Sequence, residues 1–80
     1  MPVPITMPEL GVPMAAVSLW FVGVGDTVFE GERVVEVLAA GATFDVSAPA
    51  TGKLVERLAW PRDLLQPGQV LGVLETAACG

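Results

Sequence analysis

The sequence contains no histidine and no tyrosine, and it has a single cysteine, Cys79, and a single lysine, Lys53. Without histidine, a Ser–His–Asp arrangement cannot form, and one cysteine does not make a zinc-binding cluster. A lone cysteine also closes no internal disulfide. We interpret Cys79 as a thiol near a chain end that fits a reducing compartment. The sequence therefore predicts no catalytic residues, no metal site and a cytoplasmic location.

Basic residues are also few. Four Lys and Arg stand against nine Asp and Glu, which gives a formal net charge of −5. Nucleic acids and anionic lipid surfaces are bound by clustered Lys and Arg, so we expect neither partner. No apolar run approaches the roughly 20 residues that a membrane-spanning helix needs. The first residues also lack the basic region followed by an apolar stretch that marks a signal peptide.

The 80 residues suffice for one small domain, whose core we expect over about 3–75, with a tail at 76–80. Prolines and glycines separate short apolar runs of strand length, and no window keeps a helical period. The pattern predicts an all-β fold with almost no helix. Main strands are expected at 3–7, 16–22, 34–38, 42–47, 53–59 and 70–75, with shorter extended pieces at 27–28 and 64–65.

The second half of the chain repeats the first at an offset of 37 residues. Asp26 corresponds to Asp63 (63 − 26 = 37), and Gly31 corresponds to Gly68. We interpret both aspartates as turn residues whose carboxylates accept backbone N–H groups two residues further on, and both glycines as turn residues with unusual backbone angles. Two copies predict two sheets related by a pseudo-twofold axis over one core.

Several motifs occur together in the order of a known family. They are G-D-T-V-x-x-G from Gly25 to Gly31, S-A-P-A-T-G from Ser47 to Gly52, P-G-Q-V-L from Pro67 to Leu71, and the closing Leu74-Glu75. The chain resembles the lipoyl domain of 2-oxo acid dehydrogenase acyltransferases and its sister, the biotin carboxyl carrier domain. This resemblance implies a flattened barrel-sandwich hybrid of two four-stranded antiparallel sheets. It also implies that a hairpin tip lies at one end and the termini lie at the other.

The hairpin tip is where the sequence departs from the family. Lipoyl domains usually read E-T-D-K-A there, and the lysine carries the cofactor as an amide. Here the segment reads L-A-A-G-A, so Leu38 replaces the acid, Ala40 the aspartate and Gly41 the lysine. Gly41, flanked by Ala40 and Ala42, is thus a vestigial attachment position without an amine. We expect neither lipoate nor biotin, and Lys53, at the start of a strand, is not expected to replace the missing lysine.

Three interpretations of function follow from the resemblance. In the first, the chain is a non-catalytic lipoyl-like module that binds or scaffolds a protein partner, such as a subunit of a 2-oxo acid dehydrogenase or carboxylase complex. In the second, it is a genuine carrier domain whose lysine was lost or mutated. In the third, it is the barrel-sandwich part of a membrane-fusion or efflux adaptor, although such adaptors separate the two halves with a long helical hairpin. None of the three is itself an enzyme.

Alternation along 42–47 predicts that Ala42, Phe44 and Val46 face the core and that the residues between them face water. Trp20 is expected to pack in the core. Trp60, which precedes Pro61 in a turn, is expected to be partly exposed at the rim, where it could cover the edge of the core or contact a partner.

Overall fold

The computed structural model of the chain describes residues 1–11 and 14–76, and in these residues all regular structure is β. The strands are β1 (Pro2–Thr6), β2 (Ala15–Trp20), β3 (Thr27–Val28), β4 (Arg33–Ala39), β5 (Ala42–Ser47), β6 (Gly52–Arg57), β7 (Leu64–Leu65) and β8 (Val70–Glu75). They lie within two residues of the expected ranges at nearly every boundary, and Cys79 lies outside the described residues. The described residues include no helix able to cross a membrane.

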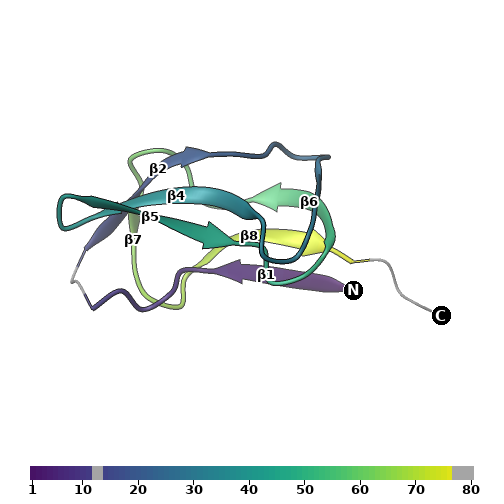
Figure 1. The fold of residues 1–80 in the computed structure, drawn as a ribbon, viewed down its shortest axis with the longest axis horizontal. Helices are drawn as coiled ribbons and strands as arrows, with labels where there is room; N and C mark the ends of the chain where they lie inside the picture. The colour runs from purple at the N-terminus through teal and green to yellow at the C-terminus, as the bar shows by residue number, and fades with distance from the viewer. Residues whose placement is uncertain (12–13, 77–80) are drawn as a thin grey trace.

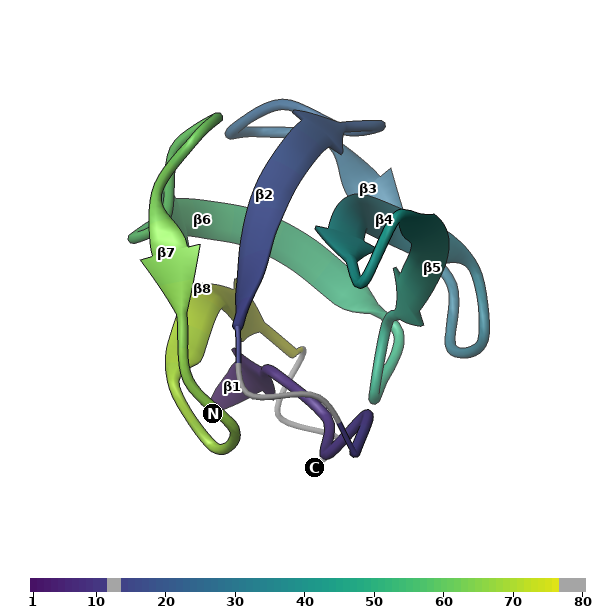
Figure 2. The same ribbon diagram turned by 90° about the vertical axis from the view of Figure 1, so that its left-hand side faces the viewer.

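The strands form two antiparallel four-stranded sheets, with orders β1-β8-β6-β3 and β5-β4-β2-β7. Figure 1 shows the β4–β5 hairpin at one end of the molecule and Met1 at the other. Figure 2 looks from the hairpin end and shows the strands wrapped around a common centre. The barrel-sandwich architecture expected from the sequence is therefore present.

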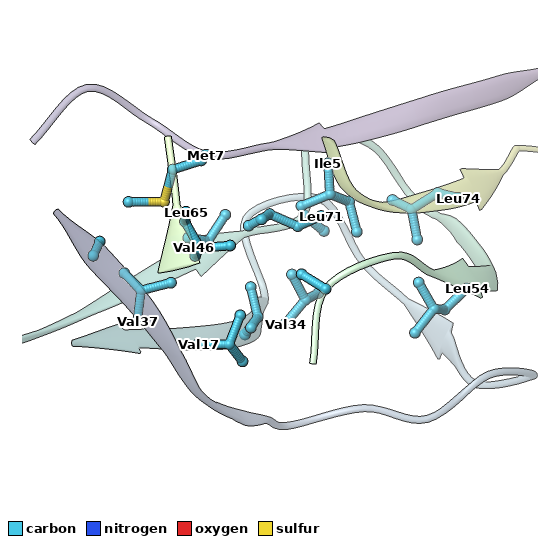
Figure 3. Packing of buried hydrophobic residues seen from close by; sticks show 14 of the residues in the cluster. Ile5, Met7, Val17, Val34, Val37, Val46, Leu54, Leu65, Leu71 and Leu74 are labelled. Carbon is cyan, nitrogen blue, oxygen red and sulfur yellow. The ribbon is translucent and has the colours of Figure 1, made fainter. Parts of the chain in front are cut away.

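The core is entirely apolar. Its buried residues come from both sheets and are mainly Val, Leu and Ala, together with Ile5 and Met7. No polar or charged residue among those described is buried. Figure 3 shows these side chains meeting between the sheets. The core side chains carry no polar group that needs a hydrogen-bond partner, so packing and hydrophobic burial stabilise the core. Among the partly exposed residues, Arg57 Nε is buried without a hydrogen-bond partner.

Trp20 joins the two sheets, which confirms the expectation that it packs against the core. The side chain is partly buried, and its indole N–H donates to the carbonyl of Ala59 at 2.9 Å. Its ring lies over Gly72 of β8, where an added Cβ would come within 3.1 Å of the indole and 2.8 Å of the Glu56 carbonyl oxygen. Glycine at this position of β8 lets a strand of one sheet approach a large side chain of the other.

The internal repeat is visible in the hydrogen bonds of its turns. The N–H of Gly23 donates to Asp26 Oδ2 at 2.8 Å, and the N–H of Trp60 donates to Asp63 Oδ2 at 2.9 Å. The two donors are 37 residues apart (60 − 23 = 37), as the two aspartates are. Both aspartates therefore stabilise turns, as expected. The bonds nevertheless run to N–H groups three residues earlier, and the expectation of donors two residues further on was wrong.

A second pair of turns repeats the same pattern. Glu32 Oε1 accepts the N–H of Phe29 at 3.0 Å, and Gln69 Oε1 accepts the N–H of Gln66 at 3.0 Å. Gly31 and Gly68, which lie within these turns, have φ values of 87° and 83°, as expected for turn glycines. The pseudo-twofold relation thus extends from the strands to the atoms that close each turn.

Candidate functional site

The tip of the β4–β5 hairpin is a two-residue turn formed by Ala40 and Gly41. Ala39 pairs with Ala42 across its base, and both turn residues have positive φ, 51° for Ala40 and 79° for Gly41. Positive φ at both central positions is the requirement of a type I′ turn, which matches the twist of the flanking strands. The tip therefore lies at the position that the sequence predicts.

Gly41 has open space around it. A Cβ built on Gly41 meets no heavy atom within 4 Å, and Ala40, Gly41 and Ala42 are exposed. A side chain at this position would project into solvent from the end of the molecule. No amine stands there, so the residues present at the tip do not fit an amide-linked cofactor.

Lys53, the only lysine of the chain, lies elsewhere. It is the second residue of β6 and pairs with Thr27 on one side and Glu75 on the other. Its strand position is the one expected from the sequence, and β6 belongs to the sheet that does not contain the hairpin. Lys53 lines a surface hollow of about 420 Å³ together with three threonines, Val55 and Glu75.

The side chains of β5 follow the expected alternation only in part. Val46 is buried, and Thr43, Asp45 and Ser47 are exposed. Phe44 is 38% exposed and Ala42 is exposed as well. Both lie on the predicted face, but the expectation that they are buried in the core was wrong. Phe44 does share the core face, since it stands opposite the buried Val37. Because β5 is the edge strand of its sheet, it has a neighbouring strand, β4, on one side only. The side chains of β5 near the tip are therefore only partly covered.

A row of uncharged residues adjoins the hairpin tip on the outer face of its sheet. Thr43, Leu38, Ala16 and Leu64 are paired in succession across four strands, so they form one row on the outer face of the sheet. Leu38 is 47% exposed and Leu64 is 64% exposed. We call the residues Leu38, Ala40, Gly41, Ala42 and Leu64 the tip surface. Ala39, grouped with the tip by sequence alone, is only 2% exposed and belongs to the core.

The sequence offered no signal that Leu64 belongs beside the tip. Leu64 comes from β7, in the second half of the chain, and reaches the row only because β7 pairs with β2. The charged residues of the hairpin begin beyond this row. Glu36 and Asp45 stand opposite each other, and Asp45 Oδ2 lies 3.4 Å from the Arg33 guanidinium.

Trp60 is a second exposed site, on the segment between β6 and β7. Its ring is 51% exposed, and the Arg57 guanidinium stacks over it at 5.1 Å from the ring centroid. Partial exposure agrees with the prediction. Within residues 1–11 and 14–76, no three His, Cys, Asp or Glu side chains are close enough to hold a metal ion.

Comparison with known proteins places these features in context. A sequence model of the family described as "Biotin-requiring enzyme" matches residues 3–74. The lipoamide acyltransferase component of the branched-chain alpha-keto acid dehydrogenase complex of Pseudomonas putida is 33% identical over 78 residues, covering 95% of this chain and 18% of that protein. The dihydrolipoyllysine-residue succinyltransferase component of the 2-oxoglutarate dehydrogenase complex of Bartonella vinsonii is 36% identical over 76 residues, covering 92% and 18% respectively.

A solved structure has the same fold. The lipoyl domain of the 2-oxoglutarate dehydrogenase complex from Azotobacter vinelandii superposes with a TM-score of 0.71 at 23% identity, covering 91% of this chain and 99% of that domain. The chain spans less than a fifth of the length of the curated acyltransferase relatives described above.

Proposed function

This chain belongs to the lipoyl and biotinyl domain family, and from this premise we propose that it is a member that carries no cofactor and works by binding a protein partner. The observation that carries the proposal is the tip, where Gly41 occupies the exposed end of the turn and offers no amine. Lipoyl and biotinyl domains attach their cofactor to a lysine at this turn. Without the lysine, the fold remains and the acylation chemistry is absent.

The lack of charge on the tip surface supports the binding of a protein partner over the carrying of a cofactor. Residues 37–44 include no charged side chain, and Leu38 and Leu64 are about half or more exposed. An uncharged surface can be covered by a partner without the desolvation penalty that a charged tip would incur. The relatives are components of 2-oxo acid dehydrogenase complexes, so a subunit of such a complex is the partner that we propose.

The test is capture of partners from the native lysate by the wild-type chain and by Ala40→Asp/Ala42→Asp. Both alanines are exposed, so the variant should fold normally while placing charge in any contact at the tip. Ala39 is unsuitable because it is buried. The matched control is Thr51→Asp, an exposed position outside the hairpin. So that the added charge is equal, the control is combined with Gln66→Asp, a second exposed position outside the hairpin. We expect a dehydrogenase-complex subunit to be captured by the wild type and the control and lost with the tip variant. Capture of no such subunit, or its retention by the tip variant, would contradict the proposal.

A further inference from the structure

The two sheets have four edges, and the structure protects three of them. β3 and β7 are edge strands of two residues each, too short to template another strand. β1 is five residues long but contains Pro2 and Pro4. β5 is six residues long and has no proline. Long edges without proline, bulge or lysine are the ones that pair with further strands.

The prolines of β1 stand where they remove the free donors of that edge. Met1 and Thr76 exchange two hydrogen bonds, each of 3.0 Å, so this pair is a hydrogen-bonded one. Hydrogen-bonded and non-hydrogen-bonded pairs alternate along an antiparallel ladder, so Pro2–Glu75 and Pro4–Val73 are non-hydrogen-bonded pairs. The backbone groups of Pro2 and Pro4 therefore point away from β8. Because proline has no N–H, Pro2 and Pro4 offer no outward donor along β1.

β5 is the pseudo-twofold counterpart of β1 and lacks this protection. Thr43 pairs with Leu38 as Pro2 pairs with Glu75, and Asp45 pairs with Glu36 as Pro4 pairs with Val73. The partners on β8 and β4 are related by the 37-residue repeat: Glu75 corresponds to Leu38 (75 − 38 = 37), and Val73 corresponds to Glu36 (73 − 36 = 37). Thr43 and Asp45 therefore occupy the positions of the two prolines, and both retain an N–H.

The type I′ turn fixes which groups of β5 face outward. In a two-residue hairpin the closing pair, here Ala39–Ala42, is hydrogen-bonded, and the pairs then alternate. The N–H and C=O groups of Thr43 and Asp45 consequently point away from β4. Within the described part of the chain, β5 has no backbone hydrogen bond to any strand except β4.

From these observations we infer that β5 is an interaction edge and that its occupant is a second copy of this chain, paired antiparallel about Phe44. In this register Phe44 faces Phe44 of the other copy across a non-hydrogen-bonded pair, where side chains are closest. Thr43 exchanges hydrogen bonds with the other copy's Asp45, and Asp45 with the other copy's Thr43. The result is one sheet continuous through both copies.

The side chains of β5 are complementary to themselves in this register. The half-exposed Phe44 rings cover each other, and Val46 meets Ala42 on the same face. Asp45 faces Thr43, which avoids the direct opposition of like charges that a register centred on Asp45 would create. Arg33, at 3.4 Å from Asp45 in each copy, further reduces repulsion between the two aspartates.

The area available to such a pairing is small, because one strand of six residues contributes the contact from each copy. Interfaces at the low end of the size range are weak and transient. Each copy also carries a net charge of −5, which opposes association at low salt. We therefore expect a concentration-dependent dimer that strengthens several-fold from about 0.01 M to about 0.15 M ionic strength, as the Debye length falls from about 30 Å to about 8 Å.

Sedimentation equilibrium from micromolar to millimolar protein tests the inference. Wild type and Thr43→Ser, which keeps the N–H, should show the same monomer–dimer equilibrium. Thr43→Pro removes an outward donor but no bond to β4, so it should fold normally and weaken dimerisation at least tenfold. A wild-type monomer at every concentration, with or without salt, would overturn the inference, as would a dimer that Thr43→Pro leaves unchanged.

Disulfide trapping in a Cys79→Ser background tests the register independently. Phe44→Cys should cross-link under mild oxidation, because non-hydrogen-bonded partners lie about 4.5 Å apart at Cα, within disulfide range. Thr43→Cys is the matched control: its copies would be diagonal neighbours about 7–8 Å apart, beyond that range. Because Phe44→Cys also removes the ring contact between the copies, both variants are oxidised at millimolar concentration, where the backbone pairing is most populated. Cross-linking of Thr43→Cys that equals or exceeds that of Phe44→Cys would overturn the proposed pairing.

Discussion

At the scale of single residues, burial separates Phe44 from the core positions that the sequence grouped with it. Alternation along β5 correctly places Phe44 on the core face, but its 38% exposure comes from its place on an edge strand beside the tip. The alternation of a strand predicts on which face of the sheet a side chain lies. It does not predict how much of that side chain is covered by neighbouring strands. The coverage depends on strand order, which the sequence pattern does not contain.

Two alanine substitutions measure this difference. Leu71 is fully buried, so Leu71→Ala should lower the free energy of unfolding by about 3–4 kcal/mol. Phe44→Ala removes a side chain that is only partly covered and should cost about 1–2 kcal/mol. Urea unfolding of both variants gives the comparison. Equal losses would mean that Phe44 is covered to the same degree as Leu71.

Gly41 defines the second prediction at this scale. Open space around its Cβ position means that Gly41→Lys meets no clash, and its φ of 79° should lower the free energy of unfolding by about 1–2 kcal/mol. We expect little acylation of this variant by a lipoate ligase, because the flanking acids are also missing. Ala40→Asp/Gly41→Lys should be acylated more, since it rebuilds the D-K pair, and aspartate tolerates the positive φ of Ala40, 51°.

Intact mass after co-expression with the ligase distinguishes the two variants. Efficient acylation of Gly41→Lys alone would show that the frame is intact and that only the lysine was lost.

At the scale of elements, the internal repeat explains why the strand boundaries could be predicted well from the sequence. The turn signals and apolar runs fixed nearly all strand boundaries, because Asp26, Asp63 and the glycines at the turns act locally. The pairing of β7 with β2, which brings Leu64 beside the tip, is a long-range consequence of folding and has no local signal. The difference between the β1 edge, where prolines remove outward donors, and the β5 edge, which keeps its donors, likewise depends on strand register, which determines the backbone groups that point outward.

Arg62 shows a departure from the repeat. Gly25 has a φ of 99°, and its counterpart Arg62 (62 − 25 = 37) has a φ of 76°. The two N–H groups make equivalent bonds, to Leu54 and Val17 respectively. A left-handed conformation costs an ordinary residue about 1–2 kcal/mol, whereas glycine adopts it freely.

Substituting glycine for Arg62 should therefore stabilise the domain. After allowing for the extra chain entropy of glycine, we expect a gain of about 0.5–1 kcal/mol for Arg62→Gly, visible as a higher melting temperature. Gly25→Ala, the reciprocal change, should lower the melting temperature. Destabilisation by Arg62→Gly would indicate that contacts of the Arg62 side chain outweigh the backbone strain.

At the scale of the whole molecule, the chain combines the lipoyl-domain fold with a hairpin tip formed by Ala40 and Gly41, which carry no amine. The core, the sheet pairing and the turn bonds are all present in the described residues. Family resemblance predicted the architecture and the place of the tip.

The most direct test of the account is the intact mass of the wild-type chain after co-expression with a lipoate ligase, and separately with a biotin ligase. Gly41 has no amine, and Lys53 lies within β6 of the opposite sheet. We expect the unmodified mass in both cases, while a family member with its tip lysine, expressed in parallel, should be fully modified. A mass increase equal to a lipoyl or biotinyl group, mapped to Lys53, would contradict it.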